Sequence, residues 1–210
     1  SQKAFEEDVL LSGFGTAPTK SEGSAVSYDD AGQQWTARYQ HETVALAFSI
    51  TEEAEEDGQY GSIASRYTKA LARSMASTKE IKAANVLNNA TTANGGDGTT
   101  LLSTAHPTQN GNQSNTLATA ADLSETSLES ILIQIADMKD DRGLRIAAQG
   151  TQLVIPTAYT FVAERLLESQ LRTGTADNDI NAIKSGGYLP QGYHVMRRLT
   201  DADAFFIKTD

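Results

Sequence analysis

Cysteine is absent from this 210-residue sequence, so the chain can form neither a disulfide framework nor a thiolate metal site. No apolar run approaches the roughly 20 residues that span a bilayer, and we expect no membrane insertion. Basic residues are scarce, 17 against 27 acidic ones, and the net charge of -10 opposes a general attraction to nucleic acid. The remaining composition, 39% hydrophobic, is ordinary for a globular protein of one domain or two small lobes.

Catalytic and cofactor motifs are missing as well. His41, His106 and His194 are far apart in the sequence and share no metal-ligand spacing. The nucleophile elbow G-x-S-x-G does not occur. Residues 13–15 (GFG) open like a dinucleotide-binding loop, but Pro18 occupies the position of the third glycine. We therefore expect no enzyme, no cofactor and no metal site.

One acidic stretch partly matches a calcium loop. Asp177, Asp179 and Asn181 have the first three ligand spacings of an EF-hand. Ala182 replaces the turn glycine, and Tyr188 stands where the loop needs a bidentate glutamate. We interpret this stretch as a turn with solvated carboxylates.

Alternating apolar and polar residues between positions 13 and 50 predict strands that are buried on one face. Asp29 to Gly32 has the composition of a turn, so we predict a long β-hairpin. A ribbon of this kind buries little surface by itself. Exposed Trp35, Tyr39 and Val44 would then pack on a partner, unless the hairpin packs back on its own domain. The alternating stretches are residues 26–29, 35–40 and 44–50.

The period changes at Ser49, which has the capping-box spacing to Glu52. Apolar residues then recur at three- and four-residue steps and predict one helix over residues 51–89, roughly 58 Å long. The acidic residues of its first turns have no basic residue four positions on, and the like-charged pairs Glu52–Glu56 and Glu53–Asp57 each cost a few tenths of a kcal/mol. Either they are solvated, or arginines of a neighbouring subunit pair with them. These acidic residues are Glu52, Glu53, Glu55, Glu56 and Asp57.

The second half predicts a compact α+β lobe after an irregular, polar segment over residues 89–122. Ser124 is the expected N-cap of a helix that ends at Gly143. The other expected elements are a strand at 153–155 ended by Pro156, a helix through 161–167, an Asp/Gly-rich link over 174–187, and strands at 193–199 and 204–208.

In this order of elements the sequence resembles major capsid proteins of tailed bacteriophages of the Hong Kong 97 type, in the branch that includes Mu-like major head subunits. The strings that carry the resemblance are residues 48–52 (FSITE), 83–88 (AANVLN), 97–98 (DG), 102–107 (LSTAHP), 153–156 (LVIP), 174–181 (GTADNDIN) and 204–210 (AFFIKTD). They extend over nearly the whole chain, and their order is more specific than any one of them.

The resemblance implies an α+β, Hong Kong 97-like fold and a division of the chain into parts. Residues 1–12 would end an N-terminal arm, 13–49 would form the extended loop, and 50–123 would form the peripheral domain with its spine helix. Residues 124–200 would form the axial domain, and 201–210 would return to the peripheral domain. Family members continue further at both ends, so we expect that the C-terminal part of that domain is missing here.

The resemblance also implies a structural function: identical subunits, in pentamers and hexamers, close an icosahedral head around double-stranded DNA without binding it specifically. Scaffolding, portal and decoration proteins are the further partners of such a head, which would assemble in the host cytoplasm and end in the virion. An encapsulin-like compartment is an alternative on the same fold. A soluble carboxylate-dependent hydrolase is a second alternative.

The expected contacts between subunits involve residues of the extended loop, the spine helix and the axial domain. Some relatives join subunits through an isopeptide bond from a loop lysine, and Lys20 lies where such a lysine could be; a solvated lysine is the alternative. The full set of contact candidates is Lys20, Glu22, Trp35, Tyr39, Glu52, Glu53, Glu56, Asp177 and Asp179.

Overall fold

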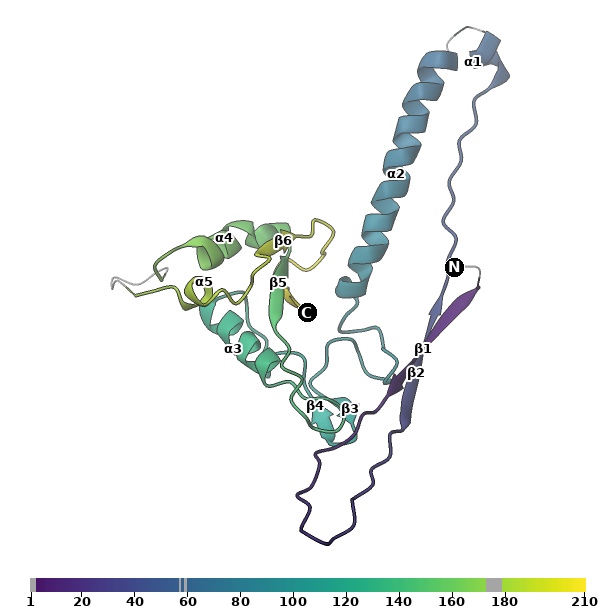
Figure 1. The fold of residues 1–210 in the computed structure, drawn as a ribbon. Coiled ribbons are helices and arrows are strands. Elements are labelled where there is room, and N and C mark those ends of the chain that lie inside the picture. Colours follow the sequence, from purple (N-terminus) through teal and green to yellow (C-terminus); the bar gives the residue numbers. More distant parts are fainter. Residues whose placement is uncertain (1–2, 57, 59, 173–178) are drawn as a thin grey trace.

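The computed structural model describes residues 3–56, 58, 60–172 and 179–210, and it has three parts (Figure 1). A compact lobe contains most of the second half of the chain. A long helix rises from the lobe as a rod, and a two-stranded ribbon with a long loop lies beside the foot of the rod. Rod and ribbon therefore project from the body of the molecule.

The ribbon pairs β1 (Phe5–Leu11) with β2 (Gln33–Gln40) in antiparallel register. Buried Ser12 closes the base of the loop between them: its amide donates to the Gly32 carbonyl at 2.8 Å, and its hydroxyl accepts from the Gly32 amide at 3.0 Å. The predicted hairpin is present, but its first strand is β1 and not residues 26–29. Glycine, serine and aspartate are frequent in residues 13–32 and disfavour strands, whereas β1 carries an aromatic and a β-branched residue.

Residues 44–50 were also expected to form a strand, and this was wrong. They run beside the rod in the direction opposite to it, where a helix offers no strand edge for pairing (Figure 1). One contact attaches this segment and another attaches the residues just before it: the rings of Phe48 and Tyr67 meet edge to face at 5.7 Å, and Lys82 pairs with Glu42 at 2.5 Å.

The rod is α2 (Tyr60–Asn88), and α1 (Glu52–Glu56) is a separate short helix at its far end (Figure 1), so the single helix expected over 51–89 is interrupted. Gly58 has φ +69°, a left-handed conformation that ends a helix and that glycine adopts without strain. With 29 residues, α2 is roughly 44 Å long. Among the described side chains of α2 only that of Ala84 is buried. The rod thus leaves most of its surface without a partner.

The segment between α2 and the lobe is largely irregular, as predicted. It holds one short hairpin, β3 (His106–Thr108) and β4 (Gly111–Gln113). Helix α3 (Glu125–Ala136) then begins at the predicted N-cap, because the Ser124 hydroxyl accepts from the Ser127 amide and the Ser127 hydroxyl accepts from the Ser124 amide.

Helix α3 ends at Ala136 and not near Gly143. Asp140 explains the difference, because its side chain accepts from the amides of Arg142 and Leu144 and closes a separate turn. Gly143 has φ +89° in that turn. The glycine therefore marks a turn that follows the helix.

The sheet of the lobe has the order β6-β5-β7, with β5 (Gly150–Ile155) parallel to β6 (Tyr193–Val195) and antiparallel to β7 (Phe206–Thr209). The 3-10 turn η1 (Thr157–Tyr159) leads into α4 (Thr160–Glu168), as Pro156 predicted. Helix α5 (Ala182–Gly186) lies in the expected link, where the Asn181 side chain caps it by accepting from the Ile183 and Lys184 amides. The core of the lobe comprises Leu123, Leu128, Leu153, Ile155, Ala163, Leu167, Ile183 and Leu189.

Candidate assembly surfaces

The ribbon is attached to the body by Trp35, which is half-buried and covers the backbone at Gly96. A Cβ atom at Gly96 would lie well inside contact distance of the Trp35 ring and 3.0 Å from the Cβ of Ala37. Only glycine permits so close an approach. The expectation that Trp35 is exposed is therefore corrected: its indole ring has a binding surface within its own chain.

A hydrogen-bonded cluster holds the turn that receives Trp35. Asp97 Oδ2 lies 2.6 Å from His106 Nδ1 and accepts from the Thr99 hydroxyl at 2.7 Å, while Asp97 Oδ1 accepts from the Thr99 amide at 3.1 Å. Burial by itself raises the pKa of Asp97, but the hydrogen bonds from His106 and Thr99 outweigh burial and lower that pKa below its ordinary value of 3.8. The sequence strings 97–98 and 102–107 thus contain a structural cluster that spacing alone did not reveal.

We expect Asp97→Asn to lower the free energy of unfolding at neutral pH by about 1–2 kcal/mol, since a charge-assisted hydrogen bond to a side chain 12% exposed is lost. Because the pKa of Asp97 is lowered in the folded state, its contribution is present above about pH 4 and is lost as the pH falls through the lowered pKa. Denaturation followed by Trp35 fluorescence from pH 6 to pH 3 measures both effects. The control is Asp8→Asn on exposed β1; equal pH profiles for wild type and Asp97→Asn would contradict the assignment.

A second attachment joins the loop between β1 and β2 to the lobe. The Arg142 guanidinium pairs with Asp29 at 2.5 Å and also donates to the Gln109 side chain at 2.7 Å. Asp29 in turn accepts from the Gly15 amide at 2.8 Å. The hydrogen bonds from Arg142 and Gly15 lower the pKa of Asp29. Arg142 thus holds both ends of the loop against the turn between β3 and β4.

We expect Arg142→Ala to release this loop and to speed tryptic cleavage after exposed Lys20 by roughly two- to fivefold, a modest effect because exposed ion pairs are weak. Arg145→Ala is the matched control: it also removes one tryptic site, and it breaks the 2.8 Å pair with Asp137 inside the lobe without touching the loop. Equal cleavage rates in the two variants would show that Arg142 does not hold the loop.

Beyond this attachment the loop is open to solvent. Lys20 and Glu22 are exposed, as are the large apolar side chains Phe14 (60%), Val26 (63%) and Tyr28 (96%). Tyr39 on β2 is 55% exposed. A loop that presents so many apolar groups to water has a surface suited to a partner.

The acidic residues at the far end of the rod remain unpaired among the described residues. Glu52, Glu53 and Glu56 are exposed on α1, and the structure describes no ion pair for them. Asp179 is exposed and its carbonyl accepts from the Arg172 amide, while Asp177 lies outside the described residues. The structure therefore distributes the predicted contact residues over loop, rod and lobe and does not gather them into one site.

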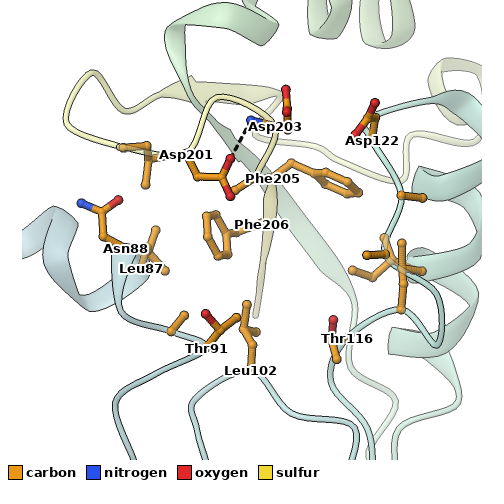
Figure 2. A pocket seen from close by; sticks show the side chains of 17 residues that line it. Leu87, Asn88, Thr91, Leu102, Thr116, Asp122, Asp201, Asp203, Phe205 and Phe206 are labelled. Carbon is orange, nitrogen blue, oxygen red and sulfur yellow. Dashed lines mark hydrogen bonds between the residues drawn. The ribbon is translucent and has the colours of Figure 1, made fainter.

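A pocket of about 380 Å³ lies where the foot of the rod meets the lobe (Figure 2). Phe206 occupies its centre between Leu87 of α2 and Leu102, and acidic residues lie along its rim. The Asn88 side chain joins the two parts, accepting from the Thr200 amide at 3.1 Å and donating to a carbonyl of the lobe. The pocket thus belongs to the joint between rod and lobe.

No group of three or more His, Asp or Glu side chains that could hold a metal occurs in the described part of the chain. His41 lies 3.7 Å from Glu6 across the ribbon, and His194 is exposed on β6. Within residues 3–56, 58, 60–172 and 179–210, no helix is long and apolar enough to cross a membrane.

Comparison with known proteins agrees with this geometry. The family model described as phage capsid protein matches residues 34–210. Two solved structures have a similar fold with a TM-score of 0.69: the capsid of bacteriophage JBD30 decorated with minor capsid protein trimers, and the bacteriophage JBD30 capsid. The first is 13% identical, with 94% of this chain and 87% of that chain covered. The second is 14% identical, with 93% and 85% covered. A search of curated proteins found no match.

Because the family model covers most of the sequence, the chain belongs to the phage capsid protein family. Its mixed helix and sheet architecture resembles a phage capsid subunit. It is a structural major capsid protein, as the sequence strings predicted, and neither the encapsulin-like compartment nor the hydrolase is favoured.

Proposed function

We propose that copies of this chain close an icosahedral shell of the Hong Kong 97-like fold around double-stranded phage DNA. The observation that carries the proposal is the shape of the subunit, in which ribbon, loop and rod project from the lobe (Figure 1). An isolated two-stranded ribbon is marginally stable in water, and a helix owes most of its stability to packing. Projections of this kind gain that packing from neighbouring copies.

The exposed apolar side chains support the same proposal. Phe14, Val26 and Tyr28 on the loop, and Leu46 beside the rod, are all more than half exposed. Burying such a side chain against a neighbour stabilises the contact by about 1.5–3 kcal/mol. Each copy makes several such contacts, so many weak contacts would stabilise a shell.

The division of labour follows from this proposal. Residues 13–49, together with β1, would reach over an adjacent subunit, and residues 50–123 would form the peripheral domain around the rod. Residues 124–200 would form the axial domain at the five- and six-fold axes. Residues 201–210 would return to the peripheral domain: their strand β7 pairs with β5 of the lobe, and Phe206 lines the pocket at the foot of the rod. Lys20, Glu22, Tyr39 and the acidic residues of α1 would meet neighbouring copies.

The net charge of the chain is consistent with a role in the wall of a shell that encloses DNA. The net charge of -10 disfavours a tight hold on DNA, so the packaged genome would be enclosed without specific binding. Scaffolding, portal and decoration proteins would be the other partners. Assembly in the host cytoplasm and a final place in the virion belong to the same proposal.

Sedimentation and electron microscopy test the proposal. The full-length protein, expressed with its phage assembly factors, is expected to sediment as megadalton particles that micrographs show as closed, angular shells. Particles from infected cells should protect DNA from nuclease. A persistent monomer of 22.5 kDa under all assembly conditions would contradict the proposal, and particles filled with an enzyme in place of DNA would favour the encapsulin-like alternative.

A further inference from the structure

The foot of α2 meets the lobe, and the upper part of the helix rises clear of the lobe (Figure 1). At the foot, Arg198 of the lobe donates to the Ser77 hydroxyl oxygen at 2.8 Å and pairs with Glu80 at 3.5 Å. Ala84, one turn further, is buried. These α2 residues share one face, and the same three- and four-residue steps continue it toward the free end of the rod through residues 66, 69 and 73. A contact that the rod already makes therefore has an uncovered continuation.

The uncovered continuation is cationic. It carries Arg66, Lys69 and Arg73, which are all exposed and which we call the basic stripe. Within the described residues none of these three side chains has an ion pair. Like charges three or four residues apart in a helix repel each other, so the stripe destabilises the rod unless an anionic group faces it. The stripe is thus suited to an acidic partner.

Helix α1 carries the complementary charges. Glu52, Glu53 and Glu56 are exposed, and their spacing of i, i+1 and i+4 places them on one side of the helix. Among the described residues of their own chain no cation pairs with them, although the basic stripe belongs to the next helix. Glu52 and Glu56 also repel each other at four-residue spacing. Each copy therefore presents two sets of like charges, of opposite sign, that its own fold leaves unpaired.

We propose that α1 of one copy docks on the basic stripe of a second copy, so that its glutamates pair with Arg66, Lys69 and Arg73. This inference rests on the proposed shell, and it specifies a contact between the rods of neighbouring subunits. Every copy carries both surfaces, so two copies can exchange the contact reciprocally or several copies can close it into a ring. In either arrangement the repulsion within each set of charges is relieved.

The phosphates of packaged DNA are the other anions that a shell subunit meets. They would neutralise the basic stripe but would leave the glutamates of α1 unpaired. The net charge of -10 also repels DNA from the chain as a whole. A second copy accounts for both sets of charges with one contact, and the observations therefore favour it.

A zero-length carbodiimide crosslinker tests the contact in assembled shells, because it joins a carboxylate directly to a lysine amine. Lys69 is the only lysine of the basic stripe. In shells made from a mixture of isotope-labelled and unlabelled chains, we expect mass spectrometry to find Lys69 linked to a glutamate of α1 in peptide pairs of mixed label. Exposed Lys79 lies on α2 but off the stripe, and it should give no link to α1. Lys69→Arg keeps the charge, so it should remove the link and leave the yield of shells unchanged.

Charge reversal tests whether the contact supports assembly. We expect Arg66→Glu with Arg73→Glu to lower the yield of shells by roughly tenfold or more, because like charges would then face one another across the contact. Adding Glu52→Arg and Glu56→Arg to the same chain should restore the yield to within about twofold of the wild type, since opposite charges face each other again. Lys79→Glu is the control and should assemble normally. Circular dichroism checks that α2 stays helical in each variant.

The outcomes separate this inference from the proposed function. Normal shells from the Arg66→Glu, Arg73→Glu chain would overturn the inference and leave the proposed function standing, as would a loss of shells that the α1 reversals do not rescue. Shells that form normally but fail to fill with DNA would overturn it too and would assign the basic stripe to the genome. Failure of the wild type to form any shell would overturn the proposed function itself.

Discussion

Leu128→Ala is expected to lower the free energy of unfolding by about 3 kcal/mol, at least a fifth of the total stability of a typical domain. Leu128 lies on the inner face of α3, is 0% exposed, and packs in the core of the lobe. Its truncation removes apolar contacts and leaves a cavity that the sheet cannot fill, because β5 is held on both edges by β6 and β7. Chemical denaturation followed by circular dichroism measures the loss.

Ile133→Ala is the matched control for this substitution. It lies five residues later in the same helix and is 64% exposed, so the substitution removes little packing and changes helix propensity by only a few tenths of a kcal/mol. We expect its effect to stay within about 0.5 kcal/mol. Equal effects at the two positions would mean that the inner face of α3 does not form the core of the lobe.

Gly96→Ala should push the Trp35 ring away from the body and destabilise the attachment of the ribbon. The new methyl group would overlap the ring and approach Ala37, and overpacking of this kind costs about 1–3 kcal/mol. Trp35 is the only tryptophan in the chain. Its fluorescence emission therefore reports the displacement directly, as a shift to longer wavelength when the indole ring meets water.

Gly95→Ala separates this effect from a general effect of alanine in the same turn. A Cβ atom there would lie 3.4 Å from Asp97 Oδ1 and 3.6 Å from the Thr99 carbonyl oxygen, close to ordinary contact. We expect its emission spectrum to match that of the wild type. An unchanged spectrum in Gly96→Ala would show that the ribbon does not rest on this turn.

Local signals in the sequence predicted several elements well. Ser124 begins α3, and the apolar run before Pro156 forms the central strand β5, because capping and burial at these places depend on neighbours in sequence. The period of α2 was also evident. Gly58 was a weak link in that period because glycine lowers helix propensity, but only its left-handed φ in the structure shows that the helix is interrupted there.

The partner of each strand was harder to predict from the sequence than the periodicity of its side chains. The strand opposite β2 is β1, which lies closer to the N-terminus than the alternating residues 26–29 that were expected to pair. Alternation shows that a segment is extended, but a strand also needs an edge to pair with. Residues 44–50 alternate equally well and form no strand, since they run along a helix.

The candidate contact residues also separate into those whose exposure the sequence predicted and those whose surroundings only the tertiary structure shows. The exposure of Lys20, Glu22 and Tyr39 followed from the sequence pattern of the loop and strand. Trp35, in contrast, is half-buried against Gly96, which is distant in the sequence. The Asp97–His106 cluster and the Asp29–Arg142 pair were not anticipated. Hydrogen bonds between residues distant in sequence leave no periodic signal.

By itself the sequence determined the elements whose cause is local: a capped helix, a buried strand, a long amphiphilic rod, and the ordered strings that place the chain among phage capsid proteins. Only the tertiary structure decided which strand pairs with β2, where Trp35 rests and which apolar faces stay uncovered. Those outcomes depend on contacts between segments far apart in the chain, and the free energy of such contacts is set by shape in three dimensions.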